Sequence, residues 1–293
     1  MLANDSDPEN NPLTVTGVSN FVGGTATVNA NNTVTYTPTA GFSGAGSFTY
    51  TITDGTTPRS APVSVTVLPP PGAVTLTPHG SASVANNVYT LTSGGTQQAG
   101  TAMSTGRIDV RQNFTVAFDV NLGASDAGAD GAAIVFHNDP RGANAIGAVG
   151  SGLAVGGIQN GLAIEFDTYQ STAAELSARG MPGSDIAADH TGFLGTNSAF
   201  ATTPVALPNI ENGAWHPVVV TWNAATQTMS YTFDGQPMGT PLTGNIATQF
   251  LGGSNFAYVG FGAATGGLSN TQSVRSINVS ATLEGQAPAL LAI

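Results

Sequence analysis

With 293 residues, the chain is long enough for two domains or one large β domain, and its formal charge is −11. All six basic residues are arginine, only 8% of the residues are charged, and there is no cysteine. An acidic chain without a basic run argues against nucleic acid and anionic membranes as partners, and the lack of cysteine excludes disulfides and thiolate metal sites. No apolar run reaches membrane-spanning length, so we expect no direct membrane insertion.

The first 68 residues predict a small all-β module. Four runs alternate apolar residues with threonine or serine, and clusters of glycine, asparagine and proline separate them, at the spacing of a β-sandwich. These runs are residues 13–16, 33–36, 48–52 and 63–67. The proline-rich residues 69–72 indicate a stiff linker, so we expect a domain boundary near residue 70.

Residues 73–284 predict a larger all-β domain, followed by a tail over residues 285–293. Apolar side chains alternate along residues 114–120, and residues 132–136 form the continuous apolar run of a strand buried on both faces. Asp234-Gly235 follows another alternating run and predicts a hairpin turn. Helix is expected only as short turns at residues 172–175 and 245–251.

One strand carries two acidic residues on the same face. Leu162, Ile164 and Phe166 alternate with Ala163, Glu165 and Asp167, so the two carboxylates project about 6–7 Å apart from the face opposite the apolar one. Such a pair needs a cation, a shared proton or full solvation. Oxygen ligands with one imidazole suit Ca²⁺, with a second Ca²⁺ or a transition ion such as Mn²⁺ beside it. The alternative interpretation is a solvated strand face. The candidates downstream are Asp185, Asp189 and His190.

These residues resemble a known family. Residues 165–169 (Glu-Phe-Asp-Thr-Tyr) are similar to the metal-site strand of the legume-type (L-type) lectins, and residues 185–190 resemble the downstream metal ligands of their bacterial relatives. Three further segments resemble the family in the same order, so the resemblance covers nearly all of residues 73–284. They are residues 129–136, 213–220 and 258–266.

The resemblance implies a concanavalin-like sandwich of two large antiparallel sheets that binds carbohydrate with the help of metal. Asp130 would accept hydrogen bonds from two sugar hydroxyls, and the Ala129–Asp130 peptide is a candidate for the cis form. Ser171 stands where the family has an asparagine that ligates Ca²⁺, and the gap from Tyr169 to Asp185 is longer than usual. The implied sugar-binding residues are Asp130, Gly152, Tyr169, Ser171, Gly266, Gly267 and Leu268. The implied metal ligands are Glu165, Asp167, Tyr169, Asp185, Asp189 and His190.

The small module has a resemblance of its own. Residues 4–9 and 48–55 are similar to the cadherin-like tandem repeats of large secreted bacterial adhesins, in which acidic residues bind Ca²⁺ at one end of each sandwich. The corresponding candidates here are Asp5, Asp7, Glu9 and Asp54. The alternative is an acidic, solvated loop. The predicted fold class is therefore all-β, with a small Ig- or cadherin-like sandwich followed by a concanavalin-like sandwich.

An enzyme on the same fold is the alternative that can be tested on the sequence. Laminarinase-type hydrolases need a Glu-x-Asp-x-x-Glu strand, in which the first Glu is the nucleophile and the last is the acid/base, and Gln170 stands at the last position. An amide cannot donate a proton to a leaving group. Hydrolysis would require Glu175 or Glu211 to enter the site, and no sequence feature predicts this, so we expect no enzyme.

The sequence thus predicts the calcium-dependent carbohydrate-binding region of an extracellular, cell-surface bacterial adhesin. Its partners would be glycans on host, algal or neighbouring bacterial surfaces, as in a biofilm. The first four residues are not a signal peptide, and we expect the chain to be a fragment of a larger secreted protein. The runner-up is a purely structural extender that Ca²⁺ rigidifies; a glycan-active hydrolase comes third.

Overall fold

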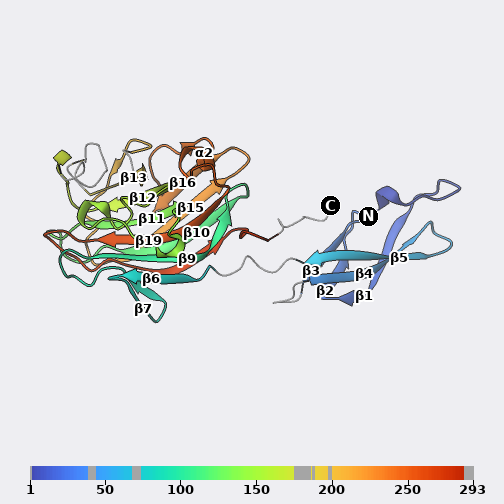
Figure 1. The fold of residues 1–293 in the computed structure, drawn as a ribbon. Coiled ribbons are helices and arrows are strands. Elements are labelled where there is room, and N and C mark those ends of the chain that lie inside the picture. The colour runs from blue at the N-terminus through green and yellow to red at the C-terminus, as the bar shows by residue number, and fades with distance from the viewer. Residues whose placement is uncertain are drawn as a thin grey trace. The chain divides into compact units, whose positions relative to one another are not determined.

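The structure is a computed structural model, and it describes residues 2–38, 44–67, 74–174, 186, 189–196 and 200–286 (Figure 1). The chain forms two compact units, one within residues 1–72 and one within residues 73–286. Both are built from antiparallel strands, so the predicted all-β class is confirmed. Four sequence expectations lie wholly or mostly outside the described residues: the linker at 69–72, the ligand Asp185, the carboxyl group of Glu175 and the tail at 285–293, of which only residues 285 and 286 are described.

The small unit consists of a three-stranded and a two-stranded sheet. The three-stranded sheet has the order β1–β4–β5, with β1 (Thr14–Val22), β4 (Gly44–Thr53) and β5 (Arg59–Val67). The two-stranded sheet pairs β2 (Gly24–Val28) with β3 (Val34–Pro38). A 3₁₀ turn, η1 (Leu2–Asn4), precedes the strands. Ala26, Phe48 and Tyr50 are buried between the sheets, and the rings of Tyr36 and Phe48 stack at 6.1 Å. All four predicted runs correspond to strands, although Leu13 and Thr33, the first residues of two runs, lie just before β1 and β3. Strand β2 was not predicted, because its residues include only two apolar side chains.

The large unit is a sandwich of two antiparallel sheets (Figure 1). One sheet has the order β14–β13–β12–β11–β19–β9–β6, and the other has the order β17–β16–β15–β10–β20–β8–β7, with β18 also paired to β16. The strands are β6 (Leu76–Gly80), β7 (Ser83–Ala85), β8 (Val88–Thr90), β9 (Ala99–Asp109), β10 (Phe114–Asn121), β11 (Gly131–His137), β12 (Gly161–Asp167), β13 (His190–Gly195), β14 (Val205–Ala206), β15 (His216–Asn223), β16 (Thr228–Phe233), β17 (Gln236–Pro237), β18 (Leu242–Thr243), β19 (Phe256–Ala264) and β20 (Ser273–Ser280).

The main core lies between these sheets, and the alternation of β10 shows why. Every second residue of β10 is buried, as predicted, and Phe118 packs against Phe166 of β12 and Phe261 of β19 with ring centroids at 6.4 and 4.8 Å. Burying aromatic side chains of this size supplies much of the apolar driving force for folding. The alternating apolar residues of β10 therefore form part of the contact between the two sheets.

Strands β11 and β12 are buried on both faces, as the continuous apolar run of residues 132–136 predicts. One face joins the main core. The other is covered by a loop layer, residues 142–158, whose Leu153, Val155 and Ile158 pack against small residues of the sheet such as Ala133 and Ala163. This layer includes two 3₁₀ turns, η2 (Gly142–Asn144) and η3 (Gly150–Gly152). It places residues 150–152 near Asp130, at the start of β11.

The turn and helix predictions are confirmed where the residues are described. Asp234 and Gly235 both have positive φ, of 50° and 75°, and Phe233 pairs with Gln236, which is the geometry of a type I′ hairpin. Helix α2 (Ile246–Gln249) begins after Asn245, whose side chain accepts the Thr248 N–H at 3.3 Å. Over the described ranges, no helix is both long enough and apolar enough to cross a membrane.

Candidate functional site

Two carboxylates and a histidine form a buried cluster on the β12 and β13 strands of the large unit. Glu165 and Asp167 lie on β12, and His190 of β13 pairs directly with Asp167. All three are almost fully buried, with exposed fractions of 3%, 3% and 1%. Their potential ligand atoms lie within 4.8 Å of one another, and His190 Nε2 is 3.3 Å from Glu165 Oε1. The alternation of β12 produces this cluster, because it turns Ile164 and Phe166 into the main core and the carboxylates to the opposite face.

The donor set of this cluster fits a divalent cation. Carboxylate oxygens and an imidazole nitrogen, gathered away from solvent, are the ligands that transition ions accept, and the oxygens also suit Ca²⁺. Burying two carboxylates side by side costs free energy unless a positive charge compensates them. The main-chain N–H of Tyr169 donates to Asp167 Oδ1 at 2.8 Å and so orients that carboxylate.

The loop that carries Asp130 is fastened directly to the end of the cluster strand. Gly131 at the start of β11 pairs with Asp167 at the end of β12. The N–H of Thr168 donates to the Asp130 carbonyl at 3.0 Å, and the N–H of Asp130 donates to the Ala264 carbonyl at 3.0 Å. The Ala129–Asp130 peptide is cis. Asp130 is thereby held between the strand that carries the cluster and the end of β19.

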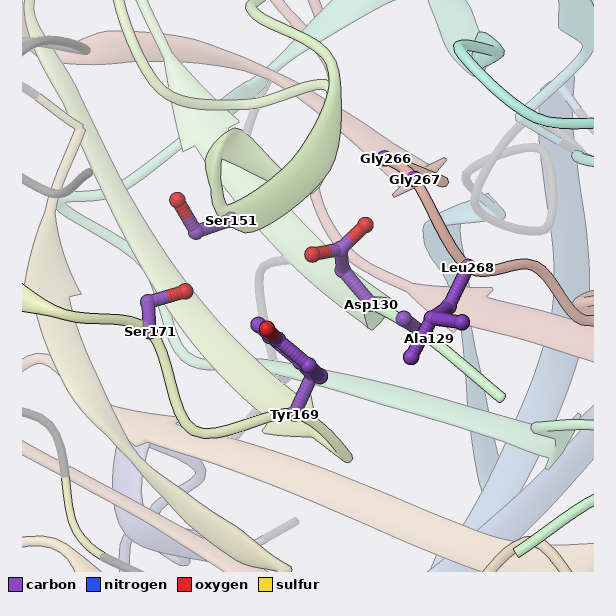
Figure 2. A pocket seen from close by; sticks show the side chains of 8 residues that line it. All are labelled: Ala129, Asp130, Ser151, Tyr169, Ser171, Gly266, Gly267 and Leu268. Atoms are coloured by element: carbon purple, nitrogen blue, oxygen red, sulfur yellow. The ribbon is translucent and has the colours of Figure 1, made fainter. Parts of the chain in front are cut away.

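The Asp130 carboxylate borders a pocket of about 160 Å³ (Figure 2). In this view its side chain rises between Ser151 and Ser171 on one side and the segment from Gly266 to Leu268 on the other, with Tyr169 below. Six of the seven residues expected to bind sugar line the pocket. The described residues that line it are Ala129, Asp130, Ser151, Tyr169, Ser171, Gly266, Gly267 and Leu268.

The wall formed by Gly266 fits closely against the carboxylate. A Cβ atom at Gly266 would lie 3.2 Å from Asp130 Oδ2 and 3.6 Å from the Cα of Gly150. The N–H of Gly150 donates to the Thr265 carbonyl at 3.1 Å, which ties the 150–152 turn to the same wall. Main chain therefore approaches the buried Asp130 side chain from the side of Gly266, as in a site that presents one carboxylate to a small ligand.

Two expected residues lie elsewhere. Gly152 does not line the pocket, because its N–H is used inside the η3 turn, where it donates to the Val149 carbonyl at 3.3 Å. The neighbouring Ser151 lines it instead, and its hydroxyl is buried with no hydrogen-bond partner. Asp189 is not part of the buried cluster; its carboxylate accepts the Ile210 N–H at 2.8 Å. A hydroxyl between two glycines was the only sequence signal for Ser151.

In the small unit, the acidic candidates bond within their own module. Both carboxylate oxygens of Asp5 accept the Tyr50 hydroxyl at 3.0 Å, and Asp7 Oδ1 accepts the N–H of Glu9 at 3.0 Å. Hydrogen bonds from the Thr56 side chain, and then from nearby main-chain N–H groups, lower the pKa of Asp54 to about 2. Within residues 2–38 and 44–67, no three acidic or histidine side chains gather closely enough to hold a metal.

Gly131 is required by the geometry beside Asp130. Its φ is +131°, and an added Cβ would lie 2.3 Å from the Phe166 carbonyl oxygen. We expect Gly131→Ala to lower the free energy of unfolding by about 3 kcal/mol or more, measured by urea denaturation. Gly267→Ala is the matched control, because a Cβ there meets nothing within 4 Å. Equal stability of the two variants would contradict the described conformation.

The residues considered for hydrolysis do not form a catalytic pair. Gln170 is exposed, and Glu211 is 2% exposed and absent from the pocket lining. Burial, followed by the charge of Asp189, raises the pKa of Glu211 to about 7. Such a pKa suits a general acid, but a carboxyl group that a substrate cannot touch cannot protonate a leaving group.

The family assignment follows from the sequence profile. The profile described as legume lectin beta-barrel domain, the L-type lectin domain, matches residues 73–278, and the chain belongs to this family. A bacterial Ig domain profile matches residues 1–68. The family consists of carbohydrate-binding proteins and not of enzymes. The expected lectin sandwich and the Ig-like nature of the small unit are thereby confirmed.

Two bacterial proteins are similar in sequence. The serine-rich adhesin for platelets of Staphylococcus aureus is 28% identical over 207 residues, which cover 64% of this chain and 9% of the adhesin. The pesticidal crystal protein Cry22Aa of Bacillus thuringiensis is 28% identical over 220 residues, which cover 67% of this chain and 30% of that protein. The chain therefore spans less than a third of the length of either relative.

Solved plant lectins share the fold. The lectin of Bauhinia forficata, solved in complex with GalNAc, has a TM-score of 0.59 at 20% identity, covering 71% of this chain and 93% of its own. Lectin II of Ulex europaeus has a TM-score of 0.58 at 20% identity, covering 73% and 95%. At this identity the similarity establishes the architecture.

Proposed function

We propose that the large unit binds carbohydrate in the Asp130 pocket and does so with the help of bound Ca²⁺. The observation that supports this most is the position of Asp130: its buried carboxylate borders a small pocket, directly beside a cluster of metal-type ligands. Sugar hydroxyls are hydrogen-bond donors, and hydrogen bonds to a carboxylate are about twice as strong as neutral ones. The pocket volume of about 160 Å³ suits a single terminal sugar better than an extended chain.

The other lining residues complete the chemistry expected of a sugar site. The hydroxyl of Ser151 points to no protein partner and is available to a sugar hydroxyl. The half-buried Tyr169 offers an aromatic surface for the apolar face of a pyranose ring. Leu268, 47% exposed, lies in the lining and is placed to contact the next group of the glycan. A mixture of one carboxylate, hydroxyls and apolar surface is typical of small-ligand pockets.

Glu165, Asp167 and His190 would hold a metal ion, and the family resemblance adds the Tyr169 carbonyl and Asp185 for Ca²⁺, with a second Ca²⁺ or Mn²⁺ beside it. A bound cation neutralises these carboxylates and favours one conformation of the loop that follows β12. That loop contains Tyr169 and Ser171, two of the pocket residues. Metal binding therefore supports sugar binding through the protein and need not involve contact with the sugar.

The likeness to an adhesin supports a cell-surface setting. We place the lectin unit on an extracellular bacterial adhesin, with the Ig-like unit as part of its stalk and glycans on host, algal or neighbouring bacterial surfaces as partners. Calcium binding of the cadherin type by Asp5, Asp7, Glu9 and Asp54 belongs to the same proposal. Alternatively, both units would be structural extenders that metal only rigidifies.

A glycan array with and without chelator tests the proposal. We expect binding to a restricted set of glycans in calcium, its loss in excess EGTA, and its return when calcium is restored. Chelator already saturated with calcium is the control for effects of the reagent itself. A chain that is folded and calcium-loaded but retains no glycan on a broad array would favour the extender instead.

The enzyme alternative makes a separate prediction. We expect no release of reducing ends from β-glucans or mixed-linkage glycans, because Gln170 is an amide and none of the other described residues lining the Asp130 pocket carries a carboxyl group. Reducing-sugar assays over long incubation provide the measurement. Steady turnover that disappears in Glu165→Gln would overturn the lectin proposal.

A further inference from the structure

Two buried side-chain amides, those of Asn270 and Gln272, have no role in the proposed function so far. Their exposed fractions are 7% and 0%, and neither residue is among those that line the pocket. Both lie in the short segment between Leu268, a pocket residue, and β20, which begins at Ser273. They therefore follow directly after the pocket wall formed by Gly266, Gly267 and Leu268.

Gln272 holds the residue that precedes Asp130. Its Nε2 donates to the Ala129 carbonyl at 2.9 Å, and its Oε1 accepts the Thr92 hydroxyl. The main chain of Gln272 is held as well, because its N–H donates to the Thr92 hydroxyl oxygen at 3.0 Å and its carbonyl accepts the Leu91 N–H at 2.8 Å. A side chain that is fixed at both ends of its amide can in turn fix the Ala129 carbonyl.

Asn270 holds an earlier part of the same chain segment. Its Nδ2 donates to the Ser125 carbonyl at 2.8 Å and to Glu211 Oε1 at 3.3 Å. The main chain of this segment closes tightly around the amide, because a Cβ atom at Gly123 would overlap Asn270 Oδ1 and one at Gly128 would overlap its Nδ2. The Asn270 side chain therefore sits in a fitted recess of residues 123–128.

These contacts connect the two sheets of the sandwich next to the pocket. Asn270 and Gln272 precede β20, whereas Ala129 and Asp130 precede β11, which belongs to the other sheet. We call residues 123–130 the Asp130 segment. The two amides bond to this segment at Ser125 and at Ala129, and so they determine how it lies against the wall from Gly266 to Leu268.

We propose that Gln272 and Asn270 are positioning residues of the pocket, whose side-chain amides hold the Asp130 segment against the wall from Gly266 to Leu268 before a ligand binds. Neither residue touches the sugar. A pocket whose walls are already in place loses less conformational entropy on binding, and its affinity is higher for that reason. The inference rests on the proposed carbohydrate site and adds how that site is kept in shape.

Gln272→Met tests the proposal, because methionine fills a similar volume in a core but removes both contacts of the amide. Titration calorimetry in saturating calcium, with a glycan found on the array, should show binding that is about tenfold weaker or more. Asn270→Ala should weaken binding in the same way. In both variants calcium should raise the melting temperature as much as in the unmodified chain, because the side chains of Glu165, Asp167 and His190 are unaltered.

Ser104→Ala is the matched control for a loss of stability alone. The Ser104 side chain is also fully buried, and it bonds to main chain by donating to the Gly106 carbonyl at 2.7 Å and accepting the Val259 N–H at 3.0 Å. Ser104 is not among the residues that line the pocket. This control should lower the melting temperature and leave the Kd for the glycan unchanged.

A measurement without ligand tests the positioning role independently of sugar binding. In backbone amide NMR of the ligand-free, calcium-loaded chain, Gln272→Met should shift or broaden the signals of Asp130, Gly131 and Leu268, whereas Ser104→Ala should leave them in place. Unchanged signals in Gln272→Met would overturn the proposal, whatever the glycan result.

The binding data distinguish the two proposals. If Asp130→Ala abolishes glycan binding while Gln272→Met and Asn270→Ala bind as tightly as the unmodified chain, the positioning role is overturned and the carbohydrate site stands. If Asp130→Ala itself binds normally, the carbohydrate site lies elsewhere, and the NMR comparison decides whether the amides hold the Asp130 segment.

Discussion

Replacing Asp130 with alanine should abolish glycan binding while leaving the lectin unit folded. Among the described residues that line the pocket, Asp130 carries the only charged group, and each hydrogen bond to a charged group contributes about 1.5–3 kcal/mol. Loss of two such bonds would weaken binding about 100-fold or more, which exceeds what a weak monosaccharide site can lose. Titration calorimetry or array binding with a responsive glycan gives the measurement.

The fold should survive because the loop is held by main-chain bonds. The N–H and carbonyl of Asp130 pair with Ala264 and Thr168, and both groups remain in the variant. Asp234→Asn serves as the charge-matched control and should bind normally. Unchanged affinity of Asp130→Ala for a glycan that the unmodified chain binds would place the sugar site elsewhere.

Removing metal should lower the melting temperature of the large unit and abolish glycan binding together. Glu165, Asp167 and His190 are buried close together, and a cation that binds only the folded state adds about 2.7 kcal/mol at a hundredfold excess over its Kd. For a unit of this size, that corresponds to a shift of roughly 5–10 °C. Scanning calorimetry with parallel binding assays in EGTA and in calcium measures both effects.

Acid should act in the same direction as chelator. Protons compete with the cation for carboxylates and imidazole, so the stabilisation by calcium should shrink as the pH falls. Glu165→Gln should show a much smaller response to calcium than the unmodified chain. A large unit that keeps both its melting temperature and its glycan binding after exhaustive chelation would show that Glu165 and Asp167 do not form a functional metal site.

The predictable parts of the fold are those in which the alternation of apolar and polar residues along a strand determines which side chains are buried. Along residues 162–167, strict alternation predicted that Glu165 and Asp167 share a face, and the structure shows them together with His190. The buried strand at 132–136 and the Asp234-Gly235 hairpin were predictable for the same reason, because period and turn chemistry are local. The order of motifs then identified the family across most of the large unit.

The positions of the loop residues could not be predicted from local sequence patterns. Whether Ser151 or Gly152 borders the pocket depends on the η3 turn, which uses the Gly152 N–H internally. Asp189 directly precedes the cluster residue His190 but lies just outside β13, and its carboxylate bonds to Ile210 in a distant loop. Glu211 shows no sequence signal at all; its environment arises only when the segments around residues 168, 189 and 270 meet.

The central claim, a sugar site at Asp130, is tested most directly by mapping a bound glycan on the protein. Backbone amide NMR of the calcium-loaded chain, titrated with a glycan found on the array, should show its largest shifts at Tyr169, Ser151 and the segment from Gly266 to Leu268. These shifts should be absent in Asp130→Ala. Saturable glycan binding whose shifts cluster on another surface, with those pocket residues unmoved, would contradict the account.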